Sequence, residues 1–143
     1  MDIQWHGSGC VSFKGKAGTL VANPCDSKIS ADVVLANSFS NDHRAIGKFG
    51  KDVKVFDWPG EYESRNIFIQ GITAYDRPRE KDSDKKDEAE KIIIFAFEMD
   101  GFKICHLGNL GHKLTPEMLE VIGDVDILLV PVGGVDCLNA EKA

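Results

Sequence analysis

The sequence has no long apolar run, no cluster of basic residues and no signal peptide. No stretch of about 18 apolar residues occurs, and residues 1–5 lack the basic and apolar regions of a secretory signal. Lys and Arg number 17 against 23 Asp and Glu, and the net charge is -6. Because nonspecific nucleic-acid affinity depends on clustered cations, we expect no nucleic-acid partner. The missing apolar run and signal peptide lead us to expect a soluble cytoplasmic protein with no membrane partner.

Paired cysteines and a serine-hydrolase motif are also missing. The cysteines are scattered along the chain, at Cys10, Cys25, Cys105 and Cys137. No Cys-x-x-Cys zinc motif is present, and we expect reduced thiols that are mostly buried as small apolar side chains. No Gly-x-Ser-x-Gly elbow surrounds Ser38 or Ser40, which argues against a serine hydrolase.

What is present is the composition of one globular domain. The 143 residues are 43% hydrophobic and 28% charged, which suits a single compact core. Alternating or continuous apolar runs predict strands over 3–5, 10–13, 19–22, 31–36, 52–56, 67–74, 92–99, 102–107 and 125–132. Many strands with few helices favour packed sheets flanked by helices.

Turn and cap residues predict several connections. Asp100-Gly101 lies between two apolar runs, which is a strong hairpin signal. Thr115 followed by Pro116 predicts the start of a helix. The apolar face of this helix is predicted to consist of Met118, Leu119 and Ile122.

Three less regular segments complete the chain. A short helix is predicted over 42–49, and 137–143 resembles the first turns of a helix that stops early. Because such a short helix is marginal alone, we expect the chain to be truncated relative to a complete domain. Residues 76–91 are nearly all charged and predict a solvated loop. The alternative is a flap that contacts a substrate or partner.

Four segments that could carry chemistry lie at the ends of predicted strands: 38–43, 59–61, 73–76 and 105–112. Loops at one edge of a sheet can converge on a single cleft. Asp42 and His43 form the best metal-like pair, because carboxylate and imidazole both bind divalent metals. The alternative is a hydrogen-bonded surface pair.

The other candidates for a pocket are Glu61, His106 and His112. Cys105 and His106 are neighbours on a predicted strand, so their side chains should point to opposite faces and cannot form a nucleophilic pair. His112 in a glycine-flanked turn and His6 at the end of the first strand are expected to be structural. Glu61 lies in a predicted Pro-Gly turn.

Taken in order, these segments resemble the metallo-β-lactamase fold, in particular the zinc-dependent hydrolases similar to ascorbate-6-phosphate lactonases. The matching motifs are Trp5-His6-Gly7-Ser8-Gly9-Cys10, Asn23-Pro24 with Asp26, Ala31-Asp32-Val33-Val34-Leu35-Ala36, Pro59-Gly60-Glu61-Tyr62-Glu63, His106-Leu107-Gly108-Asn109-Leu110-Gly111-His112 and Val125-Asp126-Ile127-Leu128-Leu129-Val130-Pro131-Val132-Gly133-Gly134. The resemblance implies an α/β fold, an αββα-type sandwich. It would form a single domain over 1–143 that lacks the final part of its second half.

The resemblance also implies a metal loop of the form His-x-His-x-Asp-His. Placed on this sequence, the motif puts Ser38 and Ser40 where the two leading histidines belong. Asp42 and His43 are kept. The first metal site has therefore lost two of its ligands.

Two further ligand positions are changed in the same comparison. Tyr75 stands near the position of the third histidine, and Asn109 aligns with the bridging aspartate but is neutral and a poorer ligand. The last histidine of the family lies beyond residue 143. Since metal-dependent hydrolysis needs about three protein ligands for each ion, zinc or another divalent metal is expected to bind weakly or not at all.

Two functions remain in view. The first is a metal-dependent hydrolase homologue with a degenerate metal site, weakly active or inactive, on an unknown small-molecule substrate. The second is a non-catalytic binding or self-assembling module that keeps the fold, with a homo-oligomer completing the missing half. An enzyme that uses Glu61, His106 or Cys25 by another mechanism has no support from residue spacing.

Overall fold

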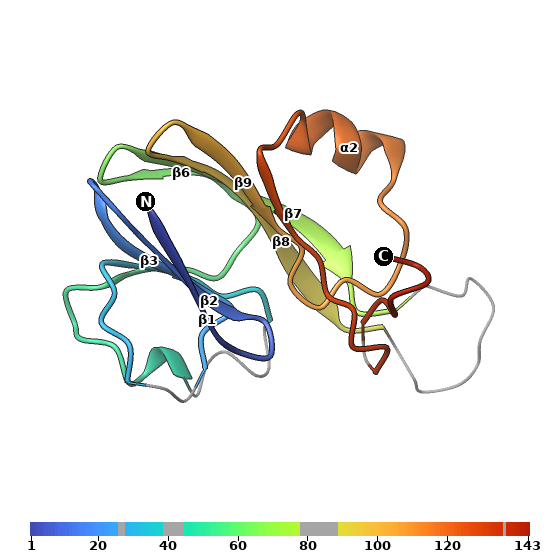
Figure 1. Ribbon diagram of the computed structural model, residues 1–143, viewed down its shortest axis with the longest axis horizontal. Helices are drawn as coiled ribbons and strands as arrows, with labels where there is room; N and C mark the ends of the chain where they lie inside the picture. Colours follow the sequence, from blue (N-terminus) through green and yellow to red (C-terminus); the bar gives the residue numbers. More distant parts are fainter. Residues whose placement is uncertain (26–27, 39–44, 78–88, 136) are drawn as a thin grey trace.

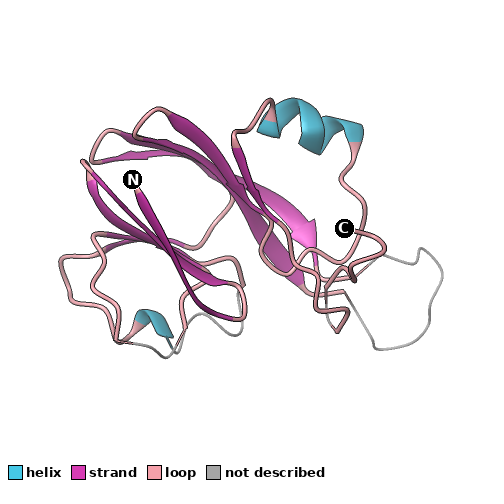
Figure 2. Ribbon diagram, viewed as in Figure 1, coloured by secondary structure: helices cyan, strands magenta, loops and turns pink. Residues whose placement is uncertain are grey.

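The chain folds into two five-stranded sheets that pack face to face, with a helix beyond the second sheet (Figure 1; Figure 2). The computed structural model describes residues 1–25, 28–38, 45–77, 89–135 and 137–143. Each sheet is built from one continuous part of the chain. None of the helices among these residues has the length and apolar character needed to cross a bilayer.

The first sheet comprises β1 (Asp2–Gly7), β2 (Cys10–Gly15), β3 (Gly18–Ala22), β4 (Val33–Leu35) and β5 (Lys54–Phe56), in that order. The first three strands form an antiparallel meander, and β4 and β5 continue the sheet in parallel with β3. All three residues of β4 are fully buried. The strand predicted from the continuous apolar run 31–36 is therefore present and is covered on both faces.

The second sheet comprises β6 (Gly60–Ser64), β7 (Ile67–Tyr75), β8 (Lys91–Met99), β9 (Phe102–His106) and β10 (Ile127–Leu129). Its strands are antiparallel except for β10, which runs parallel to β9. Asp100 and Gly101 join β8 to β9 with φ angles of 53° and 82°. Both angles lie in the left-handed region that a tight hairpin requires, so the predicted hairpin is confirmed.

The core lies between the two sheets. Its largest fully buried side chains are Phe13, Leu20, Leu35, Ile67, Ile69, Ile93, Phe95, Met99 and Ile104. Phe13 meets Phe97 edge to face across the sheets, with ring centroids 5.1 Å apart. At one side of the sandwich Phe56 of β5 stacks on Tyr62 of β6 at 4.5 Å, and this contact closes the layer between the two edge strands.

A second apolar cluster lies on the outer face of the second sheet beneath α2 (Pro116–Ile122). Thr115 caps the helix as predicted, because its hydroxyl accepts a hydrogen bond from the Met118 N–H at 3.2 Å. Met118 and Ile122, four residues apart, pack on the cluster. Leu119 is 53% exposed, so the predicted apolar face is wrong at that position.

Three other predicted elements, before β6 and around and after β10, differ from the structure. The last predicted strand, 125–132, is only three residues long as β10 and is partly exposed, because it lies at the sheet edge. Residues 137–143 form turns instead of a helix, with Lys142 N donating to Asn139 O at 3.0 Å. The turn predicted at 59–61 ends at Gly60, where β6 begins.

Parts of two other predicted segments, 42–44 and 78–88, lie outside the described residues. The start of the charged stretch is not solvated as predicted, because Asp76 is only 7% exposed. Its carboxylate accepts a hydrogen bond from Glu90 N at 2.9 Å, and its own N–H donates to Glu90 O at 3.1 Å. These bonds close the base of the segment.

Candidate functional site

Three of the four predicted loop segments meet at one end of the sandwich. Asn37 and Ser38 follow β4, Tyr75 ends β7, and residues 107–112 follow β9. The Gly111 N–H donates to Tyr75 O at 3.0 Å, and Gly108 lies so close to Asn37 that a Cβ on it would be 3.0 Å from the Asn37 Cβ. The loops therefore converge as expected.

The fourth segment lies elsewhere. Glu61 is in β6, exposed, and directly opposite Gln70 of β7. Because Ile69 points into the core, the alternation of the strand turns Gln70 and Glu61 to the outer face of the sheet. Glu61 is therefore not a pocket residue of this end of the sandwich.

Asn37 joins the two sheets and was not singled out from the sequence. Its side-chain Nδ2 donates to Ile93 O at 2.8 Å, and its main-chain carbonyl accepts from Ile93 N at 2.8 Å. The residue is fully buried, and its Oδ1 has no hydrogen-bond partner in the described part of the chain. The sequence signal for this residue was a polar side chain directly after the continuous apolar run 31–36. An amide at such a position is buried only where it forms hydrogen bonds, commonly with the main chain.

His106 makes a second connection between the sheets. It is 3% exposed, and its Nδ1 accepts a hydrogen bond from Gly108 N at 3.1 Å. The proton therefore sits on Nε2, which donates to Gly9 O of the β1–β2 turn at 2.8 Å. Burial lowers the pKa of His106 to about 4, although the hydrogen bond to Gly9 opposes this shift. The imidazole is neutral and committed to main-chain partners.

Cys105, the neighbour of His106, lies on the opposite face of β9, in the cluster under α2. Burial raises the pKa of its thiol to about 12, so the thiol stays protonated and is a poor nucleophile. The expectation that these two side chains point apart is confirmed.

His112 also uses both of its ring nitrogens. Its Nε2 accepts a hydrogen bond from Tyr75 N at 3.2 Å, so its Nδ1 carries the proton and donates to Lys113 O at 2.8 Å. An imidazole binds a metal through a nitrogen lone pair. Neither His106 nor His112 has such a lone pair left without breaking a hydrogen bond to main chain.

The remaining candidate ligands are few. Ser38 is 6% exposed and bridges to Ile92 of β8, and Asn109 is half-buried. Ser40, Asp42 and His43 lie outside the described residues. Within the described ranges, no three His, Cys, Asp or Glu side chains gather closely enough to hold a metal. Because zinc requires about three or four such ligands, the described residues do not fit a zinc ion.

A groove of about 580 Å³ opens next to this end, between the edge strands β1 and β10. Its walls are mostly apolar and are formed by Trp5, Val11, Leu129, Val130, Pro131 and Val132. Ser8, His106 and Asn109 add polar groups to its lining. Such a groove can take an apolar group and offers few charged contacts.

Two packed sheets whose loops meet at one end agree with the sandwich of the metallo-β-lactamase fold. The model of the β-lactamase superfamily domain matches residues 2–143, and the chain belongs to this family. A Thermotoga maritima protein, named as a predicted Zn-dependent hydrolase of the metallo-β-lactamase superfamily, is 36% identical with a TM-score of 0.78. The match covers 99% of this chain and 66% of the Thermotoga chain, so this chain spans just under two thirds of that protein.

Two more distant relatives agree. A UPF0173 protein of Pyrococcus abyssi is 23% identical over 163 residues, which cover 100% of this chain and 75% of the relative. A protein of Parabacteroides distasonis, named as a predicted metal-dependent hydrolase, shares the fold with a TM-score of 0.67 at 18% identity, over 90% of this chain and 68% of that one. The predicted fold and family are confirmed, and the lactonase subgroup stays a prediction.

Proposed function

We propose that this chain is a metallo-β-lactamase superfamily homologue with a degenerate metal site, and that it has weak or no metal-dependent hydrolase activity. The observation that carries the proposal is the use of His106 and His112 as hydrogen-bonding groups. Both ring nitrogens of each residue are bound to main-chain atoms. A metal hydrolase needs about three protein ligands for each ion and one open position.

The chemistry at the substituted ligand positions supports the same proposal. Ser38 is buried and its main chain forms a β-bridge with Ile92 of β8, so it offers only a hydroxyl, and Asn109 offers a neutral amide. Neither group provides the anionic or imidazole donor that zinc prefers. The sequence leaves Asp42 and His43 as the strong donors, and two ligands hold zinc weakly.

Elemental analysis tests the proposal. After equilibration with zinc and dialysis, we expect the protein to keep much less than one zinc ion per chain. Its rates on a phosphodiester such as bis(p-nitrophenyl) phosphate and on a simple lactone should match those of the His43→Ala variant. One zinc ion per chain, together with turnover that His43→Ala abolishes, would show that the site is functional.

A second function, a self-assembling module, is supported by the open side of the sandwich. The edge strands β1 and β10 both lie there. Large apolar side chains are exposed beside them: Ile3 by 45%, Trp5 by 71%, Leu128 by 48% and Val132 by 56%. Bare strand edges beside exposed apolar side chains are typical of surfaces that pair with another chain.

Sedimentation velocity tests this second function. We expect a concentration-dependent dimer, and Trp5→Lys or Leu128→Lys should shift the protein to a monomer. Phe68→Lys is the matched control, because Phe68 is also 53% exposed but lies in β7, away from the open side. A monomer at all concentrations, or an equal effect of Phe68→Lys, would contradict self-assembly through β1 and β10.

A further inference from the structure

The outer face of the first sheet carries a polar recess of about 760 Å³. Side chains alternate between the two faces of a strand. Val11, Phe13 and Leu20 point into the core, so their neighbours in the strands, such as Ser12, Lys14 and Thr19, point to the outer face. The recess is lined by Gln4 and His6 of β1, Ser12 and Lys14 of β2, and Thr19 of β3, with Asp2 at its rim. Residues 28–30 form one wall. It lies on the opposite side of the sheet from the groove between β1 and β10.

The charge of this recess is opposite to that of the whole chain. Lys14 and Lys28 stand against one carboxylate, Asp2, whereas the chain carries a net charge of -6. Neither ammonium group forms an ion pair or hydrogen bond with another described residue. Two cations that pair with no described side chain, placed beside hydroxyl groups, favour the binding of an anion.

Ser12 is held in place at the bottom of the recess. It is 8% exposed, and its Oγ lies 2.8 Å from Nε2 of His6. In the tautomer with its proton on Nε2, His6 donates to Oγ, and the proton of the hydroxyl is free to reach an anion. Thr19 adds a second hydroxyl, because it lies directly opposite Lys14 in the β2–β3 ladder.

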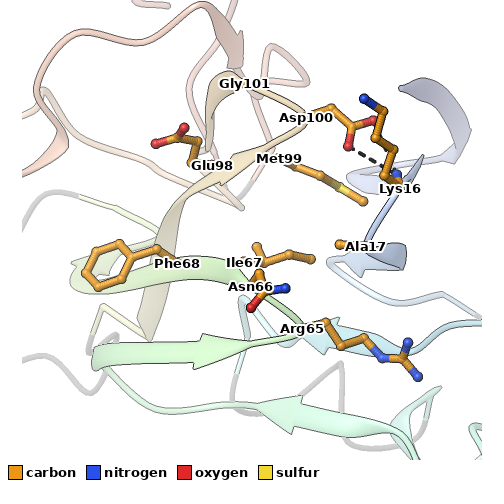
Figure 3. Close-up of a pocket in the computed structure, with 10 residues that line it drawn as sticks. All are labelled: Lys16, Ala17, Arg65, Asn66, Ile67, Phe68, Glu98, Met99, Asp100 and Gly101. Carbon is orange, nitrogen blue, oxygen red and sulfur yellow. Dashed lines mark hydrogen bonds between the residues drawn. The ribbon is translucent and has the colours of Figure 1, made fainter.

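A second hollow, lined by residues 16–17, 65–68 and 98–101, differs from the recess in how its charged groups are paired (Figure 3). Its charged groups are largely paired within the protein. The Asp100 carboxylate accepts from Lys16 N at 3.1 Å and lies 3.4 Å from the amino group of Met1. Arg65 contacts Asp32 at 2.9 Å. The pairs in this hollow join turns of the two sheets, whereas Lys14 and Lys28 form no ion pair with the residues that the structure describes.

We propose that the recess binds the phosphate or sulfate group of a small hydrophilic metabolite. Lys14 and Lys28 supply the positive charge, and Ser12 and Thr19 donate hydrogen bonds to the oxygens of the anion. Gln4, Ile29 and Ser30 line the part of the recess that the remainder of the molecule would occupy. The volume is suited to a ligand of sugar-phosphate size.

Isothermal titration with glucose 6-phosphate tests the proposal, with glucose as the probe that lacks the anion. Glucose 6-phosphate should bind and glucose should not. Lys14→Gln, Lys28→Gln and Ser12→Ala should each weaken binding by about tenfold, as expected for the loss of one charge-assisted contact. Asp2→Asn removes a repulsive charge opposite Lys14 and should tighten binding by about threefold.

Two controls keep the test specific. Lys103→Gln removes an exposed cation from β9 in the other sheet and should leave binding unchanged. Ser12→Thr keeps the hydroxyl and should retain binding, which separates loss of the donor from disturbance of the strand. Absence of binding, equal binding of glucose, or an equal loss in Lys103→Gln would overturn the proposal.

Discussion

Gly111→Ala should lower the free energy of unfolding by about 4 kcal/mol, near the upper end of single-substitution effects. A Cβ at this position would overlap the carbonyl group of Asp76 and would lie 2.6 Å from Arg77 N. These are main-chain atoms, so they cannot rotate away as a side chain can. The segment after β9 would have to separate from β7, and the hydrogen bond from Gly111 N to Tyr75 O would be lost.

Gly50→Ala is the matched control for this substitution. No atom lies within 4 Å of the Cβ that it would introduce, and the expected change is within about 0.5 kcal/mol. Thermal unfolding followed by circular dichroism should give a Tm about 10 °C lower for Gly111→Ala. Equal Tm values for the two variants would show that the chain does not approach itself so closely at Gly111.

His106→Leu should cost about 3 kcal/mol at neutral pH. Leucine fills a similar volume but leaves Gly9 O and Gly108 N buried without their partner, and each unsatisfied group costs about 1–3 kcal/mol. Urea denaturation would measure the loss. A leucine variant as stable as the native chain would show that the imidazole does not hold the two sheets together.

The same residue makes the protein sensitive to acid. The folded-state pKa of His106, about 4, is below its ordinary value of 6.5, so the unfolded chain binds more protons between these pH values. The free energy of unfolding therefore falls as pH drops from about 6.5 to about 4, by about 3 kcal/mol from this group. In His106→Leu this contribution is absent, and its stability should fall less steeply over that range than that of the native chain. Parallel slopes would exclude His106 as the source.

Elements with local causes were predictable from the sequence. The Asp100-Gly101 hairpin and the start of α2 at Thr115-Pro116 each depend on geometry within a few residues. The exposure of the Leu119 side chain and the length of β10 depend instead on which surfaces neighbouring elements cover. Periodicity alone does not show where a strand ends, so the last strand was predicted over the whole apolar run 125–132.

The candidate site shows the same division. The sequence located the loops that meet at the end of the sandwich, because each follows an apolar strand. The partners of the histidines were not predictable: Gly9 is 97 residues from His106, and Tyr75 is 37 residues from His112. Whether an imidazole is free for a metal depends on these distant main-chain atoms, which no local motif encodes.

The strand order has a consequence for how the protein folds. Within each sheet every strand pairs with its neighbour in the sequence, from β1 to β5 and from β6 to β10. Loop closure within each half is therefore short, which favours rapid formation of each sheet. Contacts such as that between Asn37 and Ile93, 56 residues apart, close later, when the two sheets dock. During synthesis the first sheet is complete before β8 leaves the ribosome. The apolar inner face of the first sheet therefore stays exposed until the second sheet packs against it.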